Sequence, residues 1–471
     1  MRISEIGFDV RAVRLCWYYR SRFKKLARFF LAQNLNSMQS SLRSAMNGGA
    51  FARLLSRVMD IVLILIVAFL IALKFRVYFT VKLILIVVSA IYLLRNLLSR
   101  ETRARAGCLN LLDLAVSLVV LSEAVNYLLS TYPPNSLPGF GEILFMFLFY
   151  WLLRFNFTRE YQRVAIFIFL TVVGGFIAGV AFWSFPGLYQ HLRELGFYDI
   201  TNFRNHIYVF NPVGLSIGEW STVLLLLLPF PLILIVKYRA HRYVTWPLMV
   251  VVAAILLTMV LTFIRGVYIA AAVFVVLGSV LFWVFRVFPP RKIVTFNLAI
   301  ILLLLVGIVP VWRPTLVTLS LFKTSSQVRS FATRQQVWKE SLRMFRDYPL
   351  TGVGAGNFTM KYVGYRTSED EAAFALRPFN VFLHILVERG LVGLLAYGFL
   401  FFSFIFVSYK KLKRFRGDVY RQSIVLLFVT AVVSVIVRDL SESSIFINYA
   451  LGTVLWFIFA NIAADETEVS V

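Results

Sequence analysis

Long apolar runs separated by short polar connections dominate the chain. Most runs approach the roughly 20 residues that an α-helix needs to cross about 30 Å of hydrocarbon. The runs cover residues 59–73, 77–94, 109–129, 140–155, 164–185, 217–236, 244–263, 267–288, 293–312, 391–409, 424–437 and 446–463. This pattern predicts an all-α integral membrane protein with roughly 12 transmembrane helices.

The short connections alternate between basic ones and ones poor in Lys and Arg, and this alternation predicts the orientation of the helices. The basic ones all fall on one side of the predicted membrane, at residues 95–105, 154–163, 237–242, 286–292 and 410–421. Since short cytoplasmic loops carry an excess of Lys and Arg, this side is assigned to the cytoplasm. Both chain termini of this multi-pass protein are then cytoplasmic.

Two connections on the outer side are much longer than the rest, and long loops often carry function. They are residues 186–216 and 313–390. We therefore divide the chain into a basic cytoplasmic leader, helices 1–9 with the first long loop, a large helical loop on the outer side between spans 9 and 10, and helices 10–12 with a cytoplasmic tail. These parts are residues 1–57, 58–312, 313–390 and 391–471.

Composition supports a membrane protein and excludes a water-soluble one. Hydrophobic residues make up 60% of the chain and charged residues 15%, with a mean hydropathy of +0.79. The net charge of +25 would suggest nucleic acid in a soluble protein, but here the basic residues lie between apolar runs, so no nucleic-acid partner is expected. The leader mixes basic and aromatic residues, which is typical of a surface helix. It serves as a topology signal, or as an arm for anionic lipid or a protein partner.

The large outer loop contains two segments with helical periodicity. In the first, Arg334, Trp338, Leu342 and Phe345 share one helical face, and Pro349 ends the helix. Alternating glycines follow in the sequence Pro-Leu-Thr-Gly-Val-Gly-Ala-Gly-Asn-Phe at 349–358. They resemble a dinucleotide fingerprint, but the strand–turn–helix context that such a fingerprint requires is missing.

The second segment starts after Pro378 and carries a polar stripe. Asn380, His384 and Glu388 are spaced four residues apart, which aligns them within about 80° of arc on one helical face. Polar groups entering a membrane are often functional. The alternative is an interfacial helix whose stripe faces water on the outer side.

Together these motifs resemble those of the bacterial O-antigen ligase and O-antigen polymerase superfamily. The resemblance consists of the Arg and Trp of the first helix, the glycine-containing motif, and the sequence Asn-Val-Phe-Leu-His-Ile-Leu-Val-Glu-Arg-Gly-Leu-Val-Gly at 380–393. Upstream, residues 204–212 resemble the outer-loop Arg of the family followed by Asn-Pro, and residues 262–266 resemble its Ser-Arg-Gly.

The resemblance implies a metal-independent inverting glycosyltransferase without a cofactor. Its donor would be a polyprenyl-diphosphate-linked glycan, and its acceptor a glycan or a lipid. The reaction would occur at the periplasmic face of the inner membrane, in O-antigen or exopolysaccharide biosynthesis. Membrane lipids and polysaccharide-assembly proteins are the further partners that this implies.

The resemblance also implies roles for individual residues. A diphosphate leaving group requires fixed positive charge, and guanidinium groups donate bidentate hydrogen bonds without losing their proton. The residues expected to bind diphosphate are Arg204, Arg265 and Arg334. Those expected to position substrate are Asn380, Asn211 and His206.

One position departs from the family pattern, because Phe379 stands where the family usually has His. A general base must lie within hydrogen-bond reach of the acceptor hydroxyl. Glu388 and His384 are the first candidates, ahead of His206 and Asp439. The departure is compatible with a polymerase-type branch, with another acceptor or with loss of activity. A transporter or flippase for lipid-linked oligosaccharide, and a non-catalytic scaffold, therefore remain alternative functions.

Overall fold

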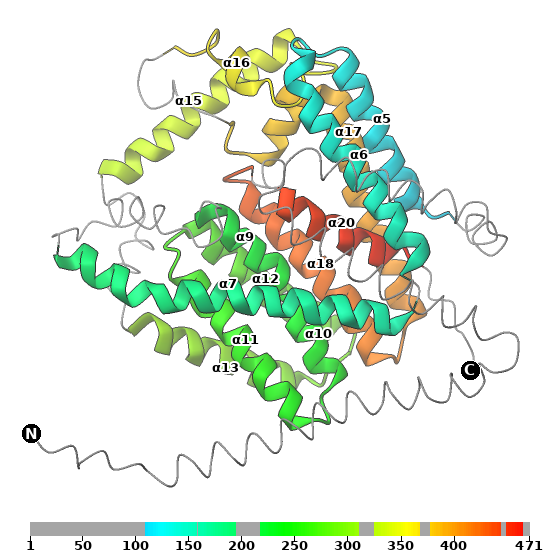
Figure 1. Ribbon diagram of the computed structural model, residues 1–471, viewed down its shortest axis with the longest axis vertical. Helices are drawn as coiled ribbons and strands as arrows, with labels where there is room; N and C mark the ends of the chain where they lie inside the picture. The colour runs from blue at the N-terminus through cyan, green and yellow to red at the C-terminus, as the bar shows by residue number, and fades with distance from the viewer. Residues whose placement is uncertain are drawn as a thin grey trace, which may run out of the picture. The chain divides into compact units, whose positions relative to one another are not determined.

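The computed structural model describes residues 109–157, 159–194, 217–309, 325–367, 377–443 and 449–464 (Figure 1). Every described residue belongs to one compact unit, Ala68–Val471. The predicted leader and the predicted spans 59–73 and 77–94 lie outside the described residues.

All regular secondary structure in the described segments is α-helical, apart from a single 3₁₀ residue. The helices are α5 (Leu111–Leu128), α6 (Pro133–Asn156), α7 (Glu160–Glu194), α9 (Ile217–Leu227), α10 (Pro229–Lys237), α11 (Arg242–Val260), α12 (Arg265–Val284), α13 (Pro290–Ile308), α15 (Ser325–Asp347), α16 (Phe358–Tyr362), α17 (Val381–Arg414), α18 (Val419–Asp439) and α20 (Tyr449–Ala463). Within the described segments, 8 helices are long and apolar enough to cross a membrane. The helical membrane class is thereby confirmed, while the total of about 12 spans stays a prediction.

Each predicted run from 109–129 onward coincides with a described helix or helix pair. The run 217–236 is a pair, because α9 ends at Leu227 and α10 begins at Pro229. Proline has no backbone N–H and its ring clashes with the preceding turn, so it starts a helix more readily than it continues one.

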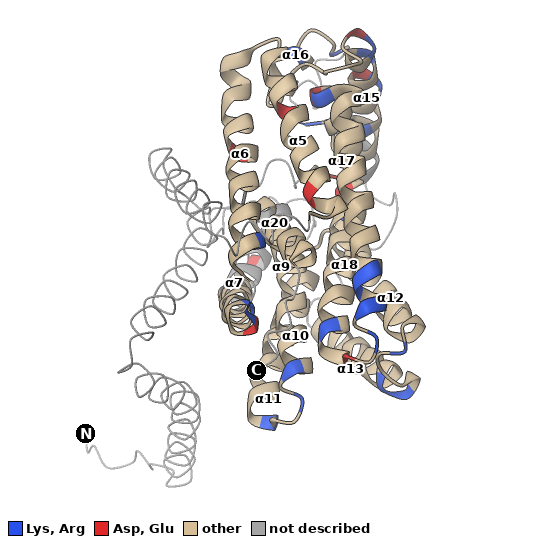
Figure 2. Ribbon diagram, turned by 90° about the vertical axis from the view of Figure 1, so that its right-hand side faces the viewer, with Lys and Arg blue, Asp and Glu red and all other residues tan. Residues whose placement is uncertain are grey.

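The helices pack in two neighbourhoods that share α18. In the first, α5 packs on α6 and α17, and α6 packs on α20; in the second, α10 and α12 pack on α18, and α11 packs on α7 and α10. Figures 1 and 2 both show α5 and α17 side by side, with α15 and α16 near one end of this pair. Large apolar side chains such as Trp183, Phe176 and Val172 are exposed on α7, as expected for a surface that faces lipid.

A kink divides α17 into two helical parts. Gly390 has φ 64° and ψ −164°, a conformation essentially restricted to glycine. A Cβ at this position would lie 2.1 Å from the carbonyl oxygen of Leu350. The predicted boundary between the large outer loop and the tenth span falls at this kink. The motif helix therefore continues directly into the membrane helix.

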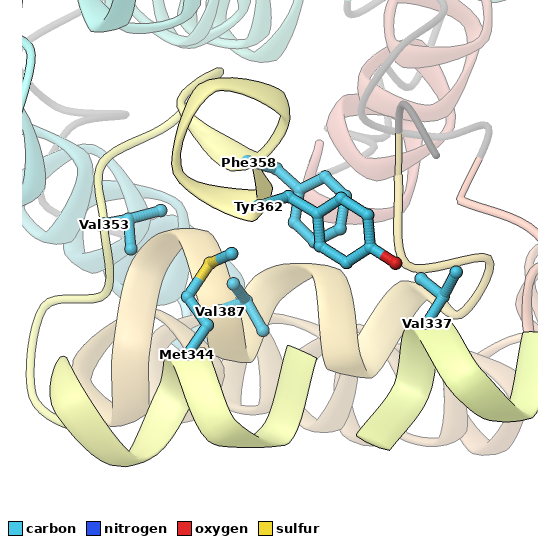
Figure 3. Close-up of a cluster of buried hydrophobic side chains, with 6 residues drawn as sticks. All are labelled: Val337, Met344, Val353, Phe358, Tyr362 and Val387. Atoms are coloured by element: carbon cyan, nitrogen blue, oxygen red, sulfur yellow. The ribbon is translucent and has the colours of Figure 1, made fainter. Parts of the chain in front are cut away.

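A small apolar core attaches α15 and α16 to the start of α17. Figure 3 shows its buried side chains, which are Val337, Met344, Val353, Phe358, Tyr362 and Val387. We call α15, α16 and the loop 348–357 between them the cap. Because these side chains come from α15, the loop, α16 and α17, the cap has a fixed position on α17.

Candidate functional site

The predicted polar stripe lies on the first part of α17 and faces the protein interior. Asn380 is the N-cap of the helix: its Oδ1 accepts a hydrogen bond from the backbone N–H of Leu383 at 3.0 Å. Its Nδ2 donates to the carbonyl oxygen of Leu440 at 3.1 Å, just after the end of α18. One turn further, His384 Nε2 lies 3.1 Å from Glu388 Oε2, and both side chains are buried. The stripe therefore does not face water on the outer side.

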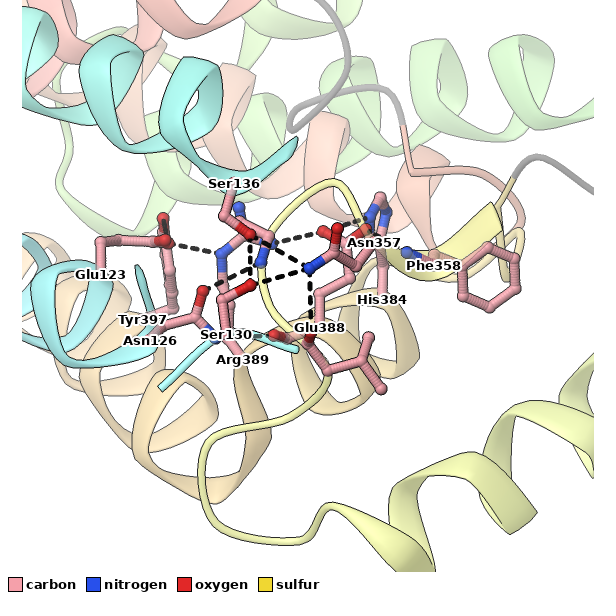
Figure 4. A network of polar contacts seen from close by, with 12 residues as sticks. Glu123, Asn126, Ser130, Ser136, Asn357, Phe358, His384, Glu388, Arg389 and Tyr397 are labelled. Atoms are coloured by element: carbon pink, nitrogen blue, oxygen red, sulfur yellow. Dashed lines mark hydrogen bonds and ion pairs between the residues drawn. The ribbon is translucent and has the colours of Figure 1, made fainter. Parts of the chain in front are cut away.

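Glu388 is the centre of the polar network that Figure 4 shows. One carboxylate oxygen accepts from the backbone N–H of Phe358 at 3.3 Å. The other lies between His384 Nε2, at 3.1 Å, and Arg389 Nη1, at 3.2 Å. Its backbone carbonyl oxygen accepts from the N–H of Gly354 at 3.0 Å. Glu388 thus contacts the cap, His384 and the next residue of its own helix at once.

The alternating glycines allow the cap loop to approach α17 closely. Gly352 has φ 69°, and a Cβ there would lie 2.4 Å from the carbonyl carbon of Glu388. The N–H of Val353 donates to the carbonyl oxygen of Val387 at 3.0 Å. Only glycine permits both the positive φ and this approach. The glycine motif is therefore used for docking the cap on the helix.

Asn357, which follows the last glycine of the motif, fastens the loop to the turn between α5 and α6. Its Nδ2 lies 2.8 Å from Ser130 Oγ and 3.2 Å from Ser136 Oγ, and it is 3.0 Å from the carbonyl oxygen of Val353. Asn357 is fully buried. The loop is thus held between α17 on one side and the α5–α6 turn on the other.

A buried charge cluster lies next to Glu388 and joins α5 to α17. Arg389 donates to Glu123 through Nε, and the hydroxyl of Tyr397 donates to the same carboxylate oxygen at 2.7 Å. Asn126, one turn after Glu123, accepts from the N–H of Ala355 at 2.9 Å. Charged groups inside a membrane helix are costly unless they are paired. The cluster therefore fixes the position of the first turns of α17 relative to α5.

A cavity of about 300 Å³ lies next to the His384–Glu388 pair. Its polar lining includes Asn135 and Glu142 from α6, Thr359 from α16, and His384, Glu388 and Arg389 from α17; its aromatic lining includes Phe401, Trp456 and Phe459. Hydrogen-bonding groups next to aromatic rings suit a ligand with hydroxyl groups and apolar faces, such as a sugar.

Two arginines converge on one carboxylate at the end of α18. Arg334 Nη2 lies 3.4 Å from Glu442 Oε1, and Arg377 Nη2 lies 3.1 Å from Glu442 Oε2. The ring of Phe379 is 5.6 Å from the guanidinium carbon of Arg334 and 5.8 Å from that of Arg377, which is cation–π distance. We call Arg334, Arg377, Phe379 and Glu442 the arginine cluster.

The first turn of α12 approaches the same end of α18. Arg265 is the first residue of α12 and is half-buried. A Cβ on the next residue, Gly266, would lie 3.0 Å from Ser441 Oγ, so the start of α12 contacts the residue that precedes Glu442. The structure therefore brings Arg265 and Arg334, two of the predicted diphosphate-binding residues, to one end of α18.

The remaining predicted residues divide into two groups. Arg204, His206 and Asn211 lie outside the described residues, so their roles stay predictions. Asp439, the fourth candidate base, is buried at the end of α18 and pairs with Arg438 at 2.9 Å. Among the described residues, no group of three or more His, Cys, Asp or Glu side chains is placed to hold a metal ion.

Several polar residues around these sites were not predicted from the sequence. They are Glu123, Glu142, Arg377, Arg389 and Glu442. A signal for two of them was present. Glu123 is an acidic residue inside an otherwise apolar run, and Arg389 follows the last residue of the polar stripe. Charges in or beside membrane helices usually have partners. The pair joins residues 266 positions apart, and nothing in the local sequence indicates such a pairing.

The comparison with protein families agrees with the motifs. A family model described as O-antigen ligase matches residues 249–398, which run from within α11 to the second part of α17. The matched segment contains Arg265, Arg334 and the whole polar stripe, together with the glycine motif. No curated protein matches the chain. The resemblance to the O-antigen ligase and O-antigen polymerase superfamily is thereby confirmed over residues 249–398.

Proposed function

We propose that the protein is an inverting, metal-independent glycosyltransferase that polymerises or ligates a polyprenyl-diphosphate-linked glycan. It acts at the periplasmic face of the inner membrane, in O-antigen or exopolysaccharide biosynthesis. One observation carries the proposal: α17 joins the arginine cluster to the cavity. Asn380 contacts Leu440 near the cluster, and His384 lines the cavity one turn later, a rise of about 6 Å along the helix.

The diphosphate of the donor binds near the end of α18. Arg265 and Arg334 provide guanidinium groups there from two different helices. Guanidinium remains protonated under all physiological conditions and matches the geometry of phosphate oxygens. It stabilises the charge that develops on the diphosphate as the glycosidic bond breaks. This positive charge does the work that a divalent cation performs in many other transferases.

The acceptor glycan occupies the cavity next to His384. Its hydroxyl oxygen attacks the anomeric carbon of the donor sugar and forms the new C–O bond. The bond from that carbon to the diphosphate oxygen breaks, and the polyprenyl diphosphate leaves with the electron pair. The hydroxyl proton passes to a general base, and the configuration at the anomeric carbon inverts.

His384 is the base that the geometry favours, with Glu388 as its positioning residue. Glu388 Oε2 lies 3.1 Å from His384 Nε2, so it orients the imidazole, which borders the cavity. The carboxylate also accepts from the backbone of Phe358 and contacts Arg389. These contacts suit a residue that orients the imidazole better than one that itself receives a proton.

The test is a transfer assay with purified protein in lipid nanodiscs, a polyprenyl-diphosphate glycan and an acceptor. We expect stoichiometric release of polyprenyl diphosphate, insensitive to metal chelation, and a loss of about 100-fold or more in Arg265→Ala. The matched control is Arg291→Ala, because Arg291 is exposed at the start of α13. Translocation of the glycan headgroup across vesicles without release of polyprenyl diphosphate would instead identify a transporter. Absence of both activities would favour a scaffold.

A further inference from the structure

The arginine cluster contains an acidic residue in the position expected of a ligand. Glu442 forms ion pairs with two guanidinium groups from different parts of the chain, Arg334 on α15 and Arg377 before α17. We infer that Arg377 is a further diphosphate-binding residue and that Glu442 is an internal anion which the donor diphosphate displaces. This inference rests on the proposed function, and it assigns roles to two residues that the motifs leave unassigned.

The ion pairs of Glu442 are placed for exchange. The exposed fractions are 16% for the Glu442 side chain, 29% for Arg334 and 22% for Arg377. Solvent therefore reaches the two guanidinium groups and part of the Glu442 side chain, while Glu442 Oε2 is buried. Partly exposed ion pairs contribute little net stability. A diphosphate carries more negative charge than one carboxylate and offers more acceptor oxygens for the two guanidinium groups. Binding of the diphosphate is therefore favoured over the internal contact.

Phe379 holds the two arginines in place for this exchange. Its ring contacts both guanidinium groups at cation–π distance, and this attraction persists when the carboxylate leaves. Its backbone has φ 53°, a conformation that is uncommon for a bulky residue and typical of functional sites. The position where the family has His is thus occupied here by an aromatic residue that supports two cations.

The backbone around the cluster also favours an anion. Phe379 immediately precedes Asn380, the N-cap of α17, and the start of α12 contacts Ser441. The N-terminal ends of helices carry partial positive charge. The N-terminal ends of α12 and α17 therefore both lie against residues 440–441, directly before Glu442.

The test is direct binding of inorganic pyrophosphate to the purified full chain in detergent, measured by calorimetry. Glu442→Gln removes the competing charge, and we expect it to tighten binding by about 5- to 10-fold. Arg377→Ala should weaken binding by about 10-fold, and Arg377→Lys should restore part of the loss. The control is Arg343→Ala, since Arg343 lies on the exposed face of α15; its affinity should be unchanged. A polyprenyl diphosphate without sugar should give the same order of affinities.

Two results would overturn the inference: unchanged or weaker binding in Glu442→Gln, or unchanged binding in Arg377→Ala. Thermal unfolding of each variant shows whether it is folded, and if Glu442→Gln is not, Arg377→Ala and Arg377→Lys decide the question. Because the readout is binding, the result is independent of transfer. Transfer activity with unchanged pyrophosphate affinities would refute the inference alone, whereas the expected affinities without transfer would refute the proposed function alone.

Discussion

At the scale of single residues, the central feature is a buried carboxylate that organises its surroundings. Glu388 contacts His384, Arg389 and the backbone of Phe358, so its removal affects both the cap and the imidazole. His384 contributes to the lining of the cavity, and its Nε2 lies 3.1 Å from the Glu388 carboxylate. Such carboxylate–imidazole pairs fix a tautomer and an orientation. The two residues are thus expected to differ in what their substitution changes.

Substitution of His384 should impair the chemical step more than substrate binding. We expect His384→Ala to lower kcat by about 100-fold or more with a KM for the donor within about 3-fold of wild type, since a general base contributes at least about 10²-fold. Glu388→Gln keeps the shape of the side chain and should lower kcat by about 10-fold, through a mispositioned imidazole. His241→Ala is the control, because His241 is exposed before α11. Equal kcat for His384→Ala and wild type would exclude His384 as the base.

The cap contains an acidic residue that should make its stability depend on pH. Burial tends to raise the pKa of Glu340, but hydrogen bonds from Tyr362, Thr367 and Gln336 outweigh it and hold the pKa below its usual value of 4.5. A carboxylate whose folded-state pKa is lowered stabilises the fold fully above that usual value, and the contribution is lost as the pH falls below it.

Tyr362→Phe tests this contribution, because it removes one donor to the Glu340 carboxylate. We expect a loss of about 1–2 kcal/mol near neutral pH, and a smaller difference from wild type at pH values below 4.5. Thermal unfolding is measured across this pH range, with proteolysis of the cap as the readout. It gives the stability difference between variant and wild type at each pH. A difference that grows as the pH falls would contradict the assigned role of Glu340.

At the scale of elements, two close backbone contacts determine how the cap docks on α17. Gly352 and Gly390 both have positive φ, and a Cβ at either would overlap backbone atoms of the other segment. The contact is completed by two N–H donors, from Val353 and Gly354, to carbonyl oxygens of α17. Docking therefore depends on the absence of side chains at two positions as much as on the apolar core.

Gly390→Ala should therefore destabilise the protein, while a glycine elsewhere on α17 tolerates the same change. The new Cβ would lie 2.1 Å from the Leu350 oxygen, and with the strained φ we expect a loss of at least about 2 kcal/mol. Gly398 has no heavy atom within 4 Å of a Cβ, so Gly398→Ala should be neutral or stabilise by up to about 1 kcal/mol. Thermal unfolding in detergent compares the two. Equal stabilities would show that the kink is not required.

The elements were largely predictable from sequence, whereas the contacts between them were not. Helical spacing alone predicted that Asn380, His384 and Glu388 share a face. The structure pairs His384 with Glu388, whereas Asn380 is the N-cap with extended backbone and precedes the helix. The two arginines that bond Glu442 could not be found in this way, since Arg334 and Glu442 are 108 positions apart. Pairing of this kind depends on where the tertiary fold places α15 relative to the residues that follow α18, and no local pattern records it.

At the scale of the whole described unit, the proposed site must lie on the side of the membrane that the predicted topology assigns to it. Figure 2 shows Lys and Arg gathered around the ends of α10, α11 and α13, where the sequence predicts the cytoplasmic connections 237–242 and 286–292. The proposed reaction at the periplasmic face requires the cap to lie on the opposite side. The site and the orientation can therefore be tested together.

Single cysteines report the side of the membrane on which each end lies. In a background with Cys16 and Cys108 replaced by Ser, we introduce Lys339→Cys on the exposed face of α15 or Arg291→Cys at the start of α13. A membrane-impermeant maleimide should label position 339 in intact spheroplasts, and position 291 only after permeabilisation, because the positive-inside rule places the basic connection in the cytoplasm. The reverse labelling would place the cap in the cytoplasm and exclude a donor delivered to the periplasmic face. Labelling of both positions only after permeabilisation would show that α15 is not exposed outside, and the acceptor cavity would then need another route of entry.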